Sequence, residues 1–256
     1  MKNHQSSIIN HKSLTIGWLY PELMNIYGDR GNIITLIKRT EWRGIKAEVK
    51  NLSPGFSDKL LATCDLLIMG GAQDKQQEIV NDDLKLHHKT LSEMIDKGIP
   101  GLYVCGGFQF MGNYYKEADG TIIDGLGIFD MNTQSPGPDE PRLVGNIAVR
   151  PSFNFNHKSS VIVGFENHGG RTILGANVKP LGTVLKGHGN NDDGTEGAIY
   201  KNSFGTYLHG PILPKNPHFA DYLIKLALKV NELPELDDTL EWHAHNAIAK
   251  RLQIEI

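Results

Sequence analysis

The stretch of sequence with the clearest chemical potential is GLYVCGGFQFMG, residues 101–112, in which Cys105 stands between an apolar run and two glycines. A sharp strand-to-helix turn would expose this thiol and aim the following N–H groups at the same point. The N-terminus of the helix would also lower the pKa of the thiol. The residues therefore predict a nucleophile at Cys105. The alternative is a small buried cysteine with no chemical role.

A reactive cysteine needs a base, and two histidines compete for that role. His209, in GTYLHGPILPKN, stands at the end of an expected strand and is followed by Gly210 and Pro211, which break the strand. His168, in ENHGGRT, is the other candidate, and a structural loop histidine is the alternative for both. Nucleophile and base are often far apart in sequence, so the spacing permits a Cys105–His209 pair.

A metal site is not expected. The eleven histidines are scattered along the chain. The pairs at 87–88 and 243–245 lack the further ligands that a zinc site needs.

The elements that must position these residues follow an alternating pattern in the first half. Residues 14–20, 46–52, 64–71 and 101–104 have the apolar character of strands, and the last two resemble strands buried on both faces. Helical spacing relates Ile33 to Leu36, Ile37 and Thr40, and separately places Leu84, His88, Leu91 and Ile95 on one face. This alternation predicts an α/β fold, with a Rossmann-like, mainly parallel sheet and helices on both faces.

The second half is richer in short strands, at 143–149, 160–165 and on both sides of Lys201-Asn202, with one further amphipathic helix around 219–230. We expect a polar N-terminal extension at 1–13, one catalytic domain at 14–233 and a helical tail at 234–256.

Composition excludes several classes of function. A formal net charge of −3 and a pI of about 6.4 leave no basic footprint for nucleic acid. No run is long and apolar enough to span a membrane. Two cysteines are too few for a disulfide framework, and this favours a cytoplasmic location.

Several motifs together resemble a known family. VCGGFQ, followed by GTYLHGP with its histidine 104 residues after the cysteine, is similar to class I glutamine amidotransferases of the cobyric acid synthase branch. Within that branch, MNIYGDRGN, GFENHGGRT, GHGNN, EGAIYKN and GTYLHGPILPKN resemble the glutaminase subunits of lipid II isoglutaminyl synthases. The resemblance extends from Leu14 to about Val230.

The resemblance implies a catalytic cycle for these residues. Cys105 would attack the carboxamide of L-glutamine, and His209 would transfer the protons. Backbone N–H groups of Gly106 and Gly71 would stabilise the oxyanion.

It also implies a set of substrate-binding residues: Gln109, Arg142, Asn167 and His168. An arginine fork suits the α-carboxylate of glutamine. A solvated loop arginine is the alternative for Arg142, and a structural turn is the alternative for Asn167 and His168.

Two positions depart from the wider class. Triad members carry a glutamate two residues after the histidine, where this chain has Pro211. The pair would then act as a dyad, or would receive an acid from elsewhere, including a partner subunit. Tyr103 also replaces a glycine that is common two residues before the cysteine.

The sequence shows no GxxxxGK[ST] motif and no dinucleotide fingerprint. No cofactor is expected in this chain, and ATP and magnesium are expected on a Mur-ligase-like partner in a heterodimer. The loop MNIYGDRGN is a candidate contact surface for that partner, or its Asp29–Asn32 segment caps the next helix.

Three other functions remain open: a glutaminase for another acceptor such as a corrinoid acid, a stand-alone cysteine hydrolase, and a non-catalytic binding subunit.

Overall fold

The computed structural model describes residues 12–72, 74–155 and 160–255. Most of the expected N-terminal extension, residues 1–13, lies outside the described residues, and Ser13 already belongs to the first strand.

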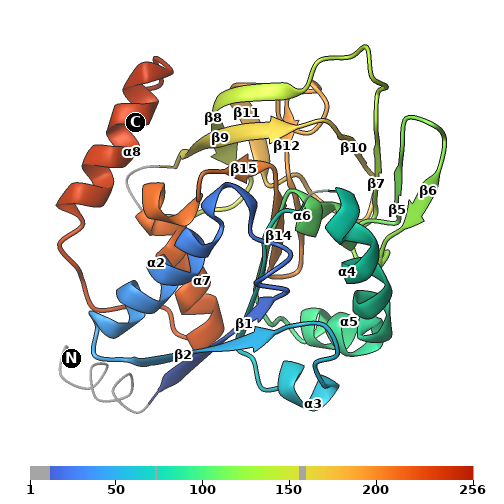
Figure 1. The fold of residues 1–256 in the computed structure, drawn as a ribbon. Helices are drawn as coiled ribbons and strands as arrows, with labels where there is room; N and C mark the ends of the chain where they lie inside the picture. The colour runs from blue at the N-terminus through green and yellow to red at the C-terminus, as the bar shows by residue number, and fades with distance from the viewer. Residues whose placement is uncertain (1–11, 73, 156–159, 256) are drawn as a thin grey trace.

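A six-stranded sheet joins four strands from the first half of the chain with two later ones, in the strand order β13-β14-β4-β3-β1-β2. Its strands β1, β2 and β14 are labelled in Figure 1. Its strands are β1 (Ser13–Leu19), β2 (Lys46–Leu52), β3 (Leu66–Met69), β4 (Gly101–Val104), β13 (Ala198–Tyr200) and β14 (Ser203–Thr206). All neighbouring strands run parallel except β13, which pairs antiparallel with β14. The prediction of a mainly parallel α/β sheet is confirmed.

Helices cover both faces of this sheet, as the apolar runs of β3 and β4 indicate. The helices are α2 (Arg30–Glu41), α3 (Asp58–Leu61), α4 (Asp74–Leu86), α5 (His88–Asp96), α6 (Gly106–Met111) and α7 (Pro217–Leu228). Leu66 and Ile68 of β3 pack in one cluster with residues of α2 and α7. Leu67 and Met69, which point the other way, pack in a second cluster with residues of α4 and α5.

The helix expected around residues 84–95 is divided in the structure. The helix is interrupted by a turn at His87, between α4 and α5. His88 is exposed rather than on the buried face. His87 turns inward instead, where its ring stacks on Phe56 at 3.8 Å and its Nδ1 lies 2.6 Å from the Asp58 carboxylate. These contacts with residues distant in sequence turn His87 inward and interrupt the helix that the spacing predicts.

Two smaller sheets form most of the second half. The first has the order β10-β7-β5-β6 and the second β12-β11-β8-β9-β15. Their strands are β5 (Tyr114–Lys116), β6 (Ile122–Asp124), β7 (Met131–Gln134), β8 (Leu143–Pro151), β9 (Ile162–His168), β10 (Arg171–Leu174), β11 (Gly182–Lys186), β12 (Thr195–Glu196) and β15 (Leu208–His209). β14 leads through Tyr207 directly into β15, so the chain carries His209 from the six-stranded sheet into the five-stranded one.

The C-terminal tail forms α8 (Thr239–Arg251), which lies at one side of the molecule (Figure 1). Ala249 packs with Ala148, Val161 and Val163 of the five-stranded sheet and its approach. Before α8, Asp238 accepts hydrogen bonds from Arg39 of α2, and Arg39 also pairs with Asp221 of α7. The tail is thus tied to both helices of one sheet face.

Within the described ranges, no helix has the length and apolar character needed to cross a membrane.

Candidate active site

Cys105 occupies a strained turn between a strand and a helix. It follows β4 directly and precedes α6, with φ 52° and ψ −107°, a conformation that residues other than glycine rarely adopt. Its N–H donates to the Thr206 carbonyl at 2.9 Å, and its own carbonyl accepts from the Gln109 N–H at 2.9 Å. The backbone thus holds the half-buried thiol at the carboxyl end of the sheet, where ligands bind in open α/β folds.

The two glycine-rich turns that follow β3 and β4 pack against each other. The Gly107 N–H donates to the Gly70 carbonyl at 3.1 Å. A Cβ added to Gly107 would lie 2.8 Å from that same oxygen, so only glycine permits this approach.

Gly71 brings the two expected catalytic residues together. A Cβ at Gly71 would lie 3.4 Å from the Cys105 Cβ and 3.5 Å from the His209 Cε1. Both side chains therefore flank the same glycine, although 104 residues separate them in sequence.

His209 is fully buried on β15, which pairs antiparallel with β9. Burial first, and the neighbouring His168 and Arg142 after it, lower the pKa of its imidazole to about 3. The ring is therefore neutral at physiological pH and can accept a proton. Pro211, which replaces the glutamate of the wider class, packs closely against Gly31 at the start of α2.

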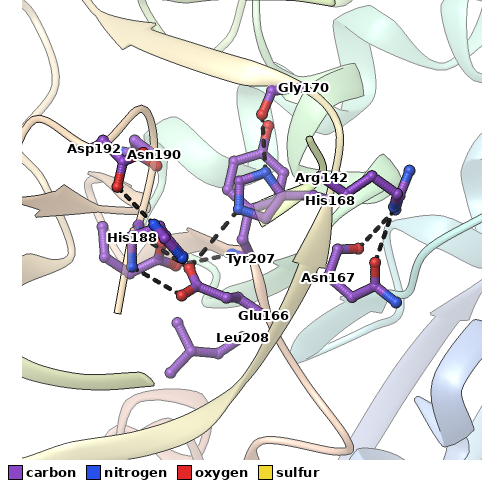
Figure 2. Close-up of polar contacts among 12 residues, drawn as sticks. Arg142, Glu166, Asn167, His168, Gly170, His188, Asn190, Asp192, Tyr207 and Leu208 are labelled. Carbon is purple, nitrogen blue, oxygen red and sulfur yellow. Dashed lines mark hydrogen bonds and ion pairs between the residues drawn. The ribbon is translucent and has the colours of Figure 1, made fainter. Parts of the chain in front are cut away.

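Arg142 is held in place by Asn167 (Figure 2). Its Nε donates to the Asn167 Oδ1 and its Nη2 to the Asn167 carbonyl, both at 2.9 Å. These two bonds fix the plane of the guanidinium. The arginine is also one of the groups that lower the pKa of His209.

Gln109 lies one helical turn after Cys105. Its Nε2 donates to the Tyr207 hydroxyl at 3.2 Å, and a Cβ at Gly170 would lie 2.7 Å from the same nitrogen. The structure thus brings Gln109 to the wall of the site.

His168, the other candidate for the base, is part of a buried polar cluster. Its ring stacks on Tyr207 with centroids 3.7 Å apart, and its Nδ1 lies 2.8 Å from the Gly170 carbonyl oxygen. Its Nε2 lies 3.9 Å from a carboxylate oxygen of Glu166 (Figure 2).

Two buried glutamates were not predicted from the sequence. The Glu166 carboxylate accepts from the N–H groups of His188 and Gly189 at 2.8 and 2.9 Å. Glu196 accepts from the Thr206 hydroxyl and the Tyr207 N–H at 2.7 and 2.8 Å, and burial raises its pKa to about 7. Both stand inside motifs that carried the family resemblance, GFENHGGRT and EGAIYKN, so the motifs were the available signal.

The oxyanion donor expected at Gly71 is engaged elsewhere. The Gly71 N–H donates to the Asp29 carboxylate at 2.8 Å. Gly106 stays beside the Gly71–Ala72 turn, with its Cβ position 3.2 Å from the Ala72 nitrogen.

No group of three or more histidine, cysteine or acidic side chains suited to a metal occurs in the part of the chain that the structure describes.

A strained cysteine beside a neutral buried histidine, at the carboxyl end of a parallel sheet, suits nucleophilic attack on an amide, and comparison with known proteins identifies the class of enzyme. Residues 15–217 match the CobB/CobQ-like glutamine amidotransferase domain. The chain therefore belongs to this family of glutamine-hydrolysing enzymes.

Among its relatives is the GatD subunit of lipid II isoglutaminyl synthase (glutamine-hydrolyzing) from Staphylococcus aureus strain N315. It is 41% identical over 93% of this chain and 96% of the relative. The GatD subunit from Streptococcus pneumoniae strain R6 is 39% identical over 89% of this chain and 87% of the relative. A probable cobyric acid synthase from Methanococcus maripaludis strain C5 is 31% identical over 72% of this chain and 37% of the relative.

Solved structures agree at the level of the fold. A glutamine amidotransferase crystal structure superposes with a TM-score of 0.57 at 13% identity, covering 83% of this chain and 98% of the other. The structure of PurLQS from Thermotoga maritima superposes with a TM-score of 0.56 at 14% identity, covering 85% of this chain and 99% of the other. The predicted class I glutamine amidotransferase fold is confirmed.

Proposed function

We propose that this chain is the glutaminase subunit of a lipid II isoglutaminyl synthase. Its identity to two GatD subunits extends over most of both chains, whereas it spans little more than a third of a cobyric acid synthase. The single observation that carries the chemistry is the convergence of Cys105 and His209 on Gly71.

In the proposed reaction the Cys105 sulfur attacks the side-chain carbonyl of L-glutamine, and His209 accepts the thiol proton. The tetrahedral intermediate collapses as His209 returns that proton to the amide nitrogen, which leaves as ammonia. Water then attacks the thioester while His209 takes one of its protons and passes it to the departing sulfur. Glutamate leaves, and the net reaction consumes one glutamine and one water.

The neutral His209 defines the starting state of this cycle. A pKa of about 3 disfavours a preformed imidazolium, so the proton moves to His209 only as the sulfur attacks. The charged groups that shift this pKa, His168 and Arg142, are both basic. The pair would act as a dyad, or would receive an orienting acid from elsewhere, including a partner subunit.

Arg142 would bind the α-carboxylate of glutamine. Its bonds to Asn167 use Nε and Nη2 and direct Nη1 away from that contact. Asn167 then acts as the residue that orients the arginine, and Gln109 lines the same pocket.

Ammonia would pass to a Mur-ligase-like subunit that binds ATP and magnesium and amidates the D-glutamate of the peptidoglycan stem peptide. A partner that binds ATP is needed because the chain itself shows no nucleotide-binding motif, and we place the resulting heterodimer in the cytoplasm as part of the proposal. A corrinoid acid as acceptor is the rival within the family. A stand-alone cysteine hydrolase would need neither the partner nor glutamine.

The test is transfer of label from [amide-¹⁵N]glutamine to lipid II by the chain together with its Mur-ligase-like partner and ATP. We expect ¹⁵N in the isoglutamine amide with the wild type and none with Cys105→Ala. Ammonium chloride should restore amidation to the variant, because the partner's site is intact. Labelling of a corrinoid acid but not of lipid II would overturn the proposed acceptor.

A further inference from the structure

Asp29 is a buried acid that the catalytic scheme above does not use. It stands between the short helix η1 (Ile26–Gly28) and α2, and it is only 1% exposed. Its Oδ2 accepts the Gly71 N–H at 2.8 Å, and its Oδ1 has no hydrogen-bond partner among the described residues.

The loop that carries Asp29 holds the Gly71 peptide on two sides. The Gly71 carbonyl accepts the Ile26 N–H at 3.3 Å, while the Gly71 N–H donates to Asp29. A Cβ on the preceding Gly70 would meet the Asp29 Oδ2 at 2.5 Å and the Met24 carbonyl at 2.4 Å. The turn after β3 therefore fits this loop only with a glycine at position 70.

The other side of the same turn lies against the candidate active site. Gly71 contacts Cys105 and His209, Gly70 accepts the Gly107 N–H, and the Ala72 nitrogen lies closest to the Cβ position of Gly106. Every contact between the turn after β3 and the nucleophile turn thus depends on how residues 70–72 are held.

Asp29 is poorly explained as a device for stability. It makes no side-chain cap on α2, although its position before that helix suggested one. Burying a carboxylate to satisfy one N–H is costly, and the desolvation raises the pKa of Asp29 to about 7. Acids retained in such surroundings are concentrated at functional sites.

We propose that Asp29 is a positioning residue of the glutaminase: its carboxylate holds the Gly71 peptide so that the turn at residues 70–72, which packs against Gly106, keeps the Gly106 N–H in place as the oxyanion donor beside Cys105. Asp29 touches neither glutamine nor the reacting atoms and acts through the turn alone. This inference rests on the proposed glutaminase function.

The test compares Asp29→Ala and the nearly isosteric Asp29→Asn with wild type, in the full chain assayed with its partner subunit. Three quantities are measured: kcat and KM for glutamine hydrolysis, and the rate at which iodoacetamide alkylates Cys105. Alkylation displaces iodide at a saturated carbon and forms no oxyanion, so it reports the thiol alone.

Loss of an oxyanion donor lowers kcat by about 10²–10³-fold, and a misplaced turn should cost part of this. We expect kcat to fall roughly ten- to a hundredfold in Asp29→Ala and less in Asp29→Asn, whose amide oxygen can still accept the Gly71 N–H. KM and the alkylation rate should stay within about threefold of wild type, because the thiol and Arg142 are untouched.

Asp65→Ala is the matched control. The Asp65 carboxylate also accepts a backbone N–H, that of Thr15 at 2.9 Å, but it lies at the opposite end of β3. This variant should lose stability and keep kcat per folded molecule. The inference is overturned by an unchanged or raised kcat in Asp29→Ala, or by hydrolysis and alkylation falling together. A wild type that does not hydrolyse glutamine would instead overturn the proposed function.

Discussion

At the scale of single residues, the site combines two costly features that the proposed glutaminase reaction would use. Cys105 has a left-handed φ of 52° that an ordinary cysteine avoids, and His209 is buried at the expense of its charged form. Each feature lowers stability by itself, and each prepares one partner of the proposed proton transfer.

The role of Arg142 predicts a specific kinetic change. Arg142→Lys should raise KM for glutamine by roughly ten- to a hundredfold with a smaller effect on kcat, because an ammonium cannot make the two bonds to Asn167 and also pair with a carboxylate. Steady-state ammonia release measures both constants. Arg171→Lys is the control, since Arg171 donates to the carbonyls of Gly169 and Pro141 in the same region. An equal KM increase in both variants would contradict a specific role for Arg142.

Glu196 predicts a pH-dependent stability. Its pKa in the folded protein, about 7, exceeds its ordinary value of 4.5. The contribution of protonated Glu196 to the free energy of unfolding is therefore fully present below about pH 4.5 and is lost as the pH rises through 7. Glu196→Gln, which resembles the protonated acid, should leave stability nearly unchanged at pH 4.5 and raise it at pH 8 by up to about 3 kcal/mol.

Urea unfolding at the two pH values measures this difference. Glu166→Gln serves as the comparison, because both Glu166 oxygens accept N–H groups and an amide nitrogen would oppose one of them. That variant should be less stable than wild type at pH 8. A Glu196→Gln protein that is less stable than wild type at pH 8 would show that the buried carboxylate is favourable.

At the scale of elements, local pattern explains most of what was predicted correctly. The apolar runs at β3 and β4 and the helical spacing in α2 and α7 each reflect burial within one element. The break at His87 could not be predicted, because it depends on Phe56 and Asp58 far along the chain. The bond from Gly71 to Asp29 was hidden for the same reason.

The close packing of the two glycine turns predicts a strong effect of a single methyl group. Gly107→Ala should lose activity at least tenfold and cost about 1–3 kcal/mol of stability, because its Cβ would press on the Gly70 carbonyl and displace the turns. Ammonia release and thermal unfolding test both parts. Gly145→Ala is the control, since a Cβ there has no neighbour within 4 Å. Wild-type activity in Gly107→Ala would contradict the account of the turns.

At the scale of the whole molecule, three sheets bring distant segments to one point. The parallel pairing of β14 with β4 sets Thr206 beside Val104, so His209 emerges close to Cys105. Sequence motifs identified both residues, but only the sheet order explains their proximity. The position of the C-terminal segment could not be predicted from local sequence, because it depends on the contacts of Arg39 in α2.

Arg39 predicts a loss of global stability without a loss of catalysis. It is buried between Asp221 and Asp238, and Arg39→Met should leave these acids without their main partner and cost about 3–5 kcal/mol. The exposed Lys38→Met, next in sequence, should change stability by no more than about 0.5 kcal/mol. Urea unfolding compares the two, and KM for glutamine should be unchanged in both. Equal stabilities would show that the Arg39 network does not hold the tail.

The most direct measurement of the central claim is ammonia release from L-glutamine by the full chain with its partner subunit, wild type against Cys105→Ala. Because the whole cycle passes through a bond to the Cys105 sulfur, the substitution should lower release by more than about 10³-fold while the protein stays folded. Release that persists in the folded Cys105→Ala protein would contradict the assignment of Cys105 as the nucleophile.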